Sequence, residues 1–179
     1  KDKDLIKWYC TQIAKLPISV HLNTEVKDIS KLDADEIVIA TGSKVRKLPI
    51  IGFEKGVEAV DFLLGNKEVG ETVAVIGGGC EIAYDLARKG KKPFIVEMAD
   101  DLIKSAGICA ANSSCLKDYL RFYKVPVYLE SSLKEIKDNG VIIQTADRIK
   151  EINCESVILS VGYTPNPLCE KSEHIHVIG

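Results

Sequence analysis

Hydrophobic residues along the chain follow two spacings, which together predict an alternation of strands and helices. Continuous apolar runs are typical of strands buried in a parallel sheet, and they cover residues 36–40, 72–76, 93–97, 125–129 and 156–161. Helical spacing and capping residues predict helices over residues 5–16, 58–64, 80–89 and 113–123. A short strand is expected over residues 18–22, after Pro17 ends the first helix.

The pattern changes in two further stretches. Residues 133–152 contain three short alternating runs joined by turn residues, which predict an antiparallel meander. Residues 44–53 contain Pro49 and Gly52, and we interpret them as an extended linker. A last short strand is expected near residues 175–178. The chain as a whole is therefore predicted to be α/β.

The charge balance excludes some classes of partner. The 179 residues include 24 Lys and Arg against 26 Asp and Glu, for a net charge of −2. Nucleic acids and anionic membranes select basic faces, so we expect neither as a partner. No apolar run reaches the length of a membrane span, and the opening Lys1-Asp2-Lys3-Asp4 is unlike a secretory signal. We expect a cytoplasmic protein.

The six cysteines carry no metal or redox pattern. They are Cys10, Cys80, Cys109, Cys115, Cys154 and Cys169. None forms a Cys-x-x-Cys pair, and the spacing of the closest two fits no common zinc or iron–sulfur site. We therefore expect reduced, buried thiols and no metal site. His21, His174 and His176 have no clustered partners in the sequence, so strand or surface roles are expected for them.

The segment 72–97 carries the chemistry. A strand runs into Gly77, Gly78 and Gly79, a helix follows, and a second strand ends at Glu97. Glycines allow a tight turn and a close approach of a pyrophosphate to the backbone, while the helix N-terminus favours an anion. Glu97 lies 97 − 77 = 20 residues after the first glycine, the spacing of a carboxylate that binds ribose hydroxyls. The segment predicts dinucleotide binding; a glycine turn needed only for packing is the alternative.

The residues around Glu97 bear on the choice of cofactor. Met98 follows directly, and we assign it to the binding site with Glu97. Asp100 and Asp101 come next, and no arginine stands beside them, so a 2′-phosphate would meet like charge. NADH is therefore favoured over NADPH, although Lys104 is close in sequence.

One position departs from the G-x-G-x-x-G fingerprint. The third glycine would fall at position 82, which is Ile82, and a bulky residue there is expected to hold the helix off the strand. Only 90 − 79 = 11 residues separate Gly79 from Gly90, so the helix is short.

Four motifs in order resemble one family. The segments EIVIATG, VAVIGGG…FIVE, SVGYTPN and IHVIG look like flavoproteins of the glutathione-reductase type, with two dinucleotide-binding domains. Within that type, GGGCEIAYDLARKGKKPFIVEM is similar to the C-terminal half of the 2-enoate reductase and 2,4-dienoyl-CoA reductase family, relatives of old yellow enzyme. The resemblance covers nearly the whole chain. Members of the family usually have about three more residues after the glycines, so either the phosphate loop is truly shorter here or about three residues after Gly79 are missing from the sequence. We favour the second, and Cys80 would then lie inside the helix.

The resemblance implies a Rossmann-like three-layer domain, a central parallel sheet with an antiparallel meander, flanked by partial FAD-domain segments. It places residues 1–57 in a partial FAD-domain segment and linker, 58–160 in the NAD(H)-binding domain and 161–179 in the return segment.

The resemblance also assigns single residues. Ala40, Thr41 and Gly42 match the A-T-G segment of the FAD domain, near the crossing to the NAD domain, and Gly162 matches the return toward the FAD domain.

The function implied by the resemblance is the first step of an electron path. Hydride passes from NADH to FAD, and electrons then reach FMN and an enoate or enoyl thioester through an iron–sulfur cluster. FMN and the cluster are expected only in the full-length protein, whose remaining domains are the expected partner of this chain, and the fragment alone is not expected to be active. We assign no catalytic acid, base or nucleophile, and a solvated position is expected for Glu81. The alternatives are an S-adenosylmethionine-binding methyltransferase domain and a binding-only dinucleotide module.

Overall fold

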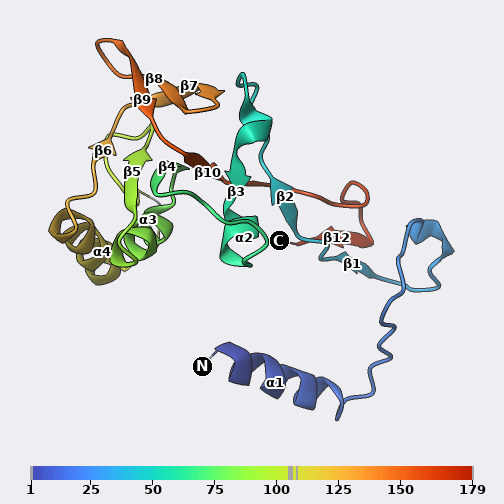
Figure 1. Ribbon diagram of the computed structural model, residues 1–179. Coiled ribbons are helices and arrows are strands. Elements are labelled where there is room, and N and C mark those ends of the chain that lie inside the picture. The colour runs from blue at the N-terminus through green and yellow to red at the C-terminus, as the bar shows by residue number, and fades with distance from the viewer. Residues whose placement is uncertain (1, 105–106, 108, 179) are drawn as a thin grey trace. The chain divides into compact units, whose positions relative to one another are not determined.

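A computed structural model describes residues 2–104, 107 and 109–178 of the chain. Within these residues the chain divides into two compact units, one made of residues 2–41 and 167–178 and the other of residues 42–166 (Figure 1). The second unit holds the predicted strand–glycine–helix segment. The domain limits that we place at 57/58 and 160/161 stay predictions.

The first unit contains a parallel pair of short strands. Strand β1 (Ile37–Ile39) pairs with β12 (Ile175–Val177). The apolar run 36–40 predicts a strand, which is confirmed, but its expected burial is wrong for Val38, which is 58% exposed. Two strands shield only part of each other's surface, so alternate side chains of β1 stay at the surface.

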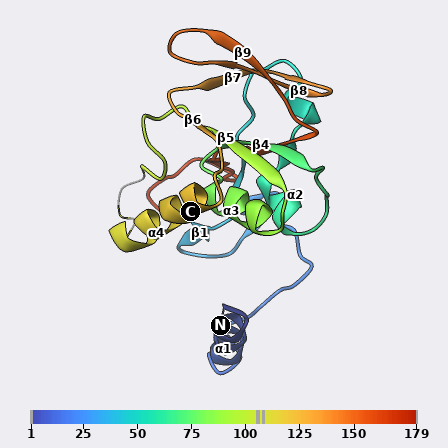
Figure 2. The ribbon, with the colours of Figure 1, turned by 60° about the vertical axis from the view of Figure 1, so that its left-hand side comes forward.

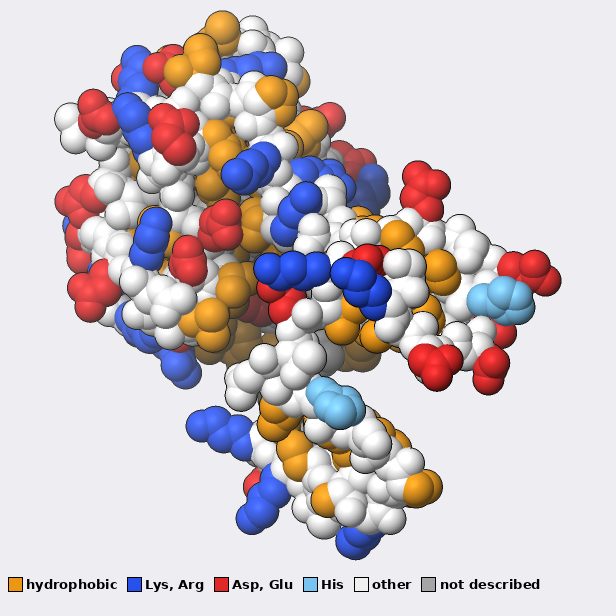
Figure 3. All heavy atoms as spheres, turned by 90° about the vertical axis from the view of Figure 1, so that its right-hand side faces the viewer, with side chains coloured by type: hydrophobic (Ala, Val, Ile, Leu, Met, Phe, Trp, Pro, Cys, Tyr) orange, Lys and Arg blue, Asp and Glu red, His pale blue; other side chains and the backbone are white. Residues whose placement is uncertain are grey.

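The N-terminal helix of the first unit is confirmed, whereas the strand expected after it is not. Helix α1 (Asp2–Ile13) is followed by turns, and residues 18–22 form no strand; a single-turn helix, η1 (Ile29–Lys31), comes next. Strand formation needs a pairing partner, and the described residues offer none to residues 18–22. The large hydrophobic side chains of α1, including Trp8 and Ile6, lie at the surface (Figure 3).

A five-stranded parallel sheet forms the centre of the second unit, as predicted. Its strand order is β3-β10-β4-β5-β6, with every pair parallel. The bounds are β3 (Val57–Glu58), β4 (Thr72–Gly77), β5 (Lys92–Val96), β6 (Val127–Tyr128) and β10 (Ser156–Ser160). The middle strands are apolar on both sides because both faces of the sheet are covered.

Alternate residues of β4 face two different layers. Val73 and Val75 belong to the core that includes the helices, and Ala74 and Ile76 belong to the core that includes the meander. The helices of this unit are α2 (Ala59–Leu63), α3 (Cys80–Arg88) and α4 (Ala110–Phe122). Figure 2 shows α3 and α4 on one side of the sheet and the meander on the other. The predicted three-layer Rossmann-like class is confirmed.

The meander is also confirmed, and it holds the linker in place. It consists of β7 (Ser132–Lys137), β8 (Gly140–Gln144) and β9 (Ile149–Asn153). The linker passes through a short helix, η2 (Phe53–Lys55), and the Ile136 amide of β7 donates to the Ile51 carbonyl at 2.9 Å. Gly52 has a φ of +75°, and a Cβ there would stand 2.1 Å from the Ile136 carbonyl oxygen. Only glycine fits at this point of the linker.

The linker is also less irregular than the sequence predicts. Its start forms β2 (Ser43–Val45), which pairs antiparallel with β11 (Tyr163–Pro165). Three-residue strands with mixed polar and apolar residues leave no periodic signal, because their order comes from the pairing partner 118 residues away, from 45 to 163.

Two further expectations need correction. Helix α4 begins at Ala110, three residues before the predicted start at residue 113, and no side-chain cap bond is made at its start. The thiols are free, but Cys10, Cys109 and Cys115 are exposed, so the expected burial holds only for Cys80 and Cys154, with Cys169 intermediate. A small uncharged thiol tolerates either environment, so composition alone does not fix its burial.

No helix among the described residues is long and apolar enough to cross a membrane.

Candidate functional site

The glycine turn and the predicted acid meet at one edge of the parallel sheet. Gly77 ends β4 and is the register partner of Ser160, the last residue of β10. On the other side, Ile76 of β4 pairs with Val96 of β5, directly before Glu97. Ligands of open parallel sheets bind at this carboxyl edge.

The space around the Cβ position differs among the three glycines. Gly77 has a φ of +83°, and a Cβ would lie 2.5 Å from the Ser160 carbonyl oxygen. At Gly79 a Cβ would lie 2.5 Å from Cγ1 of Val75, so Gly79 brings the turn close against the strand. At Gly78 nothing stands within 4 Å of the Cβ position. Packing therefore explains Gly77 and Gly79, whereas no neighbour among the described residues requires a glycine at Gly78.

The start of α3 presents free backbone donors beside this turn. The first bond of the helix runs from the Ala83 amide to the Gly79 carbonyl at 2.9 Å. The N–H groups of Cys80, Glu81 and Ile82 have no backbone acceptor among the residues that the structure describes. Gly79 provides no side-chain cap. Unpaired N–H groups and the helix dipole together attract an anion.

The expected steric conflict at Ile82 is resolved by burial. Its side chain is 6% exposed and packs in the core under α3 with Val73 and Leu86. The close approach that a third glycine would give the helix is made one turn earlier, by Gly79. Glu81 is exposed, as expected for a solvated helix residue.

Cys80 occupies the first position of α3, yet its thiol is not activated. A helix N-terminus lowers a thiol pKa, whereas burial raises it. Here burial dominates: the side chain is 1% exposed, and desolvation raises the pKa of Cys80 to about 11, with Glu81 and Glu97 adding to the rise. Cys80 is a packing residue at neutral pH.

The Glu97 carboxylate is half-buried and held in position. Its Oε1 accepts a hydrogen bond from the Ala99 amide at 3.0 Å. The backbone on either side is tied to the sheet, because the Glu97 amide donates to the Tyr128 carbonyl and the Ser131 amide donates to the Glu97 carbonyl, both at 2.9 Å. The second oxygen, Oε2, is left for hydroxyl donors.

In the structure, lysines pair with the two aspartates that follow Glu97. Asp100 forms an ion pair with Lys104, and Asp101 forms one with Lys117 at 2.6 Å. Hydrogen bonds from these lysines hold the pKa of both aspartates below the usual range. Of these three carboxylates, only Glu97 has no ion-pair partner among the described residues.

A cavity of about 250 Å³ lies between the glycine turn and Glu97, and we call it the glycine-turn pocket. It is lined by the ends of β4, β5 and β10, by the start of β7, and by linker residues 46, 48 and 50. Gly77, Gly78, Glu97 and Met98 all line it, so the structure brings these predicted residues together, whereas Gly79 and the residues of α3 do not line it. Arg46 also lines it. Sequence reasoning missed Arg46 because it lies in the linker, outside the motif.

The four residues assigned through the FAD-domain motifs do not line this pocket. Ala40 and Thr41 end the first segment of one unit, and Gly42 begins the other. Gly162 has a φ of +85°, and its carbonyl accepts the Arg46 amide at 3.0 Å. These positions therefore lie where the chain passes between its two units.

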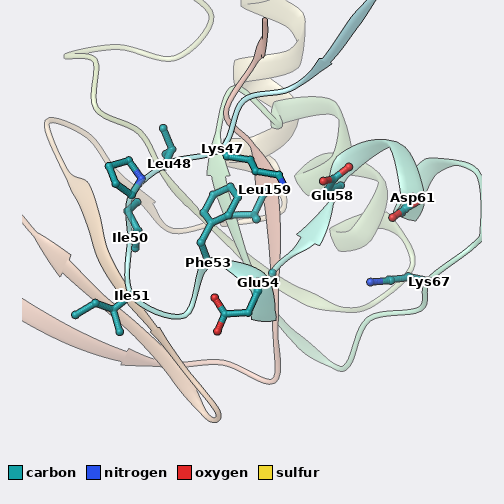
Figure 4. A pocket seen from close by; sticks show the side chains of 12 residues that line it. Lys47, Leu48, Ile50, Ile51, Phe53, Glu54, Glu58, Asp61, Lys67 and Leu159 are labelled. Carbon is teal, nitrogen blue, oxygen red and sulfur yellow. The ribbon is translucent and has the colours of Figure 1, made fainter. Parts of the chain in front are cut away.

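A larger cavity, of about 610 Å³, lies on the other side of the linker (Figure 4). Lys47 and Phe53 line it together with the acidic residues Glu54, Glu58 and Asp61. None of the three glycines of the turn contributes to it. Its size alone therefore does not make it the dinucleotide site.

Two of the histidines have a partner that the sequence does not indicate. Glu36 accepts from His176 Nε2 at 2.7 Å and contacts His174 Nδ1 at 3.1 Å, which corrects the expectation of no clustered partner. The pairing arises because β1 and β12 are neighbours. Among residues 2–104, 107 and 109–178, no group of three or more His, Cys, Asp or Glu could hold a metal ion.

Comparison with known proteins gives a family match over nearly the whole chain. The model of the pyridine nucleotide-disulphide oxidoreductase family matches residues 2–177. A cinnamate reductase of Clostridium sporogenes is 37% identical over 168 residues, covering 90% of this chain and 25% of the relative. An NADH oxidase of Thermoanaerobacter brockii is 29% identical and covers 99% of this chain and 30% of the relative.

A solved structure shows the same arrangement. A 2-naphthoyl-CoA reductase in complex with 2-naphthoyl-CoA superposes with a TM-score of 0.80 and 26% identity, over 99% of this chain and 29% of that one. This chain thus spans between a quarter and a third of the length of these relatives.

Proposed function

Because this chain belongs to the pyridine nucleotide-disulphide oxidoreductase family, we propose that it is the NADH-binding module of a multidomain flavoprotein reductase. A flavoprotein reductase domain with NAD- and FAD-binding relatives is what the family match and the similar proteins support. This membership favours a redox dinucleotide site over the methyltransferase alternative.

One observation carries the proposal: the glycine-turn pocket combines an open approach at Gly78 with a fixed carboxylate at Glu97. The pyrophosphate would lie against Gly78 and the free N–H groups of α3. The adenosine ribose would place its hydroxyls on Glu97. The pocket is smaller than the 300–1,000 Å³ of typical ligand sites, so it receives only part of a dinucleotide, and the rest extends along the sheet edge.

The residues present fit a nicotinamide dinucleotide, whose chemistry when bound is hydride donation. Within this chain, the turn and the start of α3 hold the phosphate, and Glu97 orients the ribose. No acid, base or nucleophile is required of the protein for that step, and Cys80, whose thiol stays protonated, supplies none.

We propose FAD as the acceptor of the hydride, bound with help from segments outside the second unit. The Ala40-Thr41-Gly42 segment and Gly162 are the residues of this chain that we assign to that boundary. FMN and an iron–sulfur cluster are proposed for other parts of the longer protein, since the described residues hold no cysteine set that fits a cluster. The partner of this chain is then the rest of its own polypeptide.

The substrate class is inferred from the relatives. Cinnamate reductase and 2-naphthoyl-CoA reductase are named for an unsaturated acid and an unsaturated thioester. We propose that the electrons leaving this module reduce an enoate or an enoyl thioester on a separate FMN domain. We also propose a cytoplasmic location, which the free thiols favour because reducing compartments keep cysteines unpaired.

Titration calorimetry with NADH and NADPH tests the proposal on the full chain. We expect NADH to bind more tightly than NADPH, and Glu97→Gln to weaken NADH binding about 10-fold through loss of charge-assisted hydrogen bonds to the ribose. A folded chain that binds neither dinucleotide refutes the proposal. Tighter binding of NADPH refutes the role of Glu97.

A further inference from the structure

The backbone around the glycine turn offers few donors to a pyrophosphate. The Gly78 amide donates to the Ser160 carbonyl at 3.2 Å, and the Gly79 amide donates to the Gly77 carbonyl at 2.8 Å. Three N–H groups at the start of α3 are left. The dipole of a helix is equivalent to about half an elementary charge at its N-terminus, whereas a pyrophosphate diester carries two negative charges. The turn alone leaves most of that charge uncompensated.

Arg46 brings a full positive charge to the same pocket. It follows β2 directly, and its amide is fixed by the Gly162 carbonyl at 3.0 Å. Arg46 lines the glycine-turn pocket with Gly77, Gly78 and Glu97. Among the described residues, no carboxylate forms an ion pair or hydrogen bond with the Arg46 guanidinium, Glu97 included. Both charges are therefore free to bind a ligand.

Arg46 and its neighbour Lys47 line different cavities. Arg46 lines the glycine-turn pocket and not the larger cavity, Leu48 and Ile50 line both, and residues 47, 49 and 51 line only the larger cavity. Lys47, one residue away and of the same charge, thus lies on the larger cavity and not on the glycine-turn pocket (Figure 4).

We propose that Arg46 is a binding residue for the dinucleotide, with its guanidinium paired to the pyrophosphate between the Gly77-Gly78 turn and Glu97. This inference rests on the proposed function and extends it to a residue outside the glycine motif. A guanidinium donates two parallel hydrogen bonds to phosphate oxygens, which suits a site where backbone donors are few. If Arg46 pairs with the pyrophosphate, Glu97 remains available for the ribose. The two opposite charges then bind neighbouring parts of one ligand.

The test compares Arg46→Gln with Lys47→Gln in the full chain, by titration calorimetry with NADH, ADP-ribose and adenosine. We expect Arg46→Gln to raise the Kd for NADH and ADP-ribose about 10- to 100-fold, the loss of a charge-assisted hydrogen bond. The Kd for adenosine, which has no phosphate, stays unchanged. Arg46→Lys keeps the charge but not the paired donors, and an intermediate Kd is expected. Lys47→Gln should match the wild type with all three ligands.

The outcomes separate this inference from the proposed function. If the wild-type chain binds NADH and Arg46→Gln binds it within twofold, the inference is wrong and the proposed function stands. If a parallel titration with NADPH shows that Arg46→Gln weakens NADPH binding but not NADH binding, the guanidinium contacts a 2′-phosphate, and its assignment to the pyrophosphate is overturned. If Lys47→Gln weakens binding as much as Arg46→Gln, the effect comes from the net charge of the chain and not from a specific contact, and the inference is wrong. If the wild type binds no dinucleotide, the proposed function fails, and the inference with it.

Discussion

Gly78→Ala separates a ligand-binding glycine from a glycine needed for folding. The Cβ of an alanine at 78 would meet nothing within 4 Å, and the φ of Gly78 lies outside the left-handed region. Such a substitution reduces the freedom of the unfolded chain and stabilises a protein by about 0.4–1 kcal/mol. For a chain of this size, we expect the Tm to stay constant or to rise by roughly 1–4 °C.

The same methyl group has a large effect on binding if the pyrophosphate approaches here. It would occupy the space through which a phosphate oxygen reaches the N–H groups of α3. Loss of one such charge-assisted hydrogen bond costs about 1.5–3 kcal/mol, which corresponds to a rise in Kd of about 10- to 100-fold. Thermal unfolding by circular dichroism and calorimetric titration with NADH measure the two effects on the same sample.

Gly65→Ala serves as the matched control. Gly65 has a φ of +76° with nothing within 4 Å of its Cβ position, and it does not line the glycine-turn pocket. Alanine there is strained by about 1–2 kcal/mol, so stability should fall while the Kd for NADH stays constant. A folded Gly78→Ala protein that binds NADH within twofold of the wild type would refute our placement of the pyrophosphate.

Three further predictions concern other parts of the chain. Gly52→Ala should destabilise the second unit by more than about 2 kcal/mol in urea unfolding, because it adds a backbone clash to a positive φ; an unchanged midpoint contradicts the linker contact. Iodoacetamide at pH 8 should label exposed Cys109, whose pKa is lowered by nearby backbone N–H groups, well before buried Cys80, and equal rates by mass spectrometry would contradict this. The two histidine hydrogen bonds hold the pKa of Glu36 below its usual 4.5, so their stabilisation of β1 is present above pH 4.5 and lost as the pH falls through the lowered value. Glu36→Gln should abolish that pH dependence in the amide NMR signals of β1, and an unaltered titration would refute it.

The sequence predicts the central sheet well because its signal is local. The runs 72–76 and 156–161 are apolar at their inner positions, as covering on both faces requires, and the structure confirms them as β4 and β10. The run 18–22, in which Ser19 and His21 alternate with apolar residues, forms no strand. The composition of a segment indicates that it can be buried in a sheet. It becomes a strand only where another segment pairs with it.

The pairing of charges near the candidate site is also not predictable from the sequence alone. Asp100 and Asp101 look like a repulsive pair in the sequence, yet each is paired with a lysine, and Lys117 comes from helix α4. The sequence therefore singles out Glu97 but overstates the negative charge around it. Electrostatic selectivity depends on the distances between charges in space, and the spacing of residues along the sequence does not give these distances.

The linker explains why the remaining part of the site is not visible in the motif. The glycine turn and Glu97 are encoded within 26 residues, 72–97, but the cation that we propose for the same ligand comes from a segment that the β2–β11 pairing brings to the sheet edge. That pairing fixes the Arg46 backbone through Gly162, and Arg46, not Lys47, lines the glycine-turn pocket. A one-residue shift of this register would exchange the two residues and place a lysine over the turn. In our proposal, β2 and β11 therefore contribute to the binding site, because the register between residues 43–45 and 163–165 decides which cation would meet the dinucleotide.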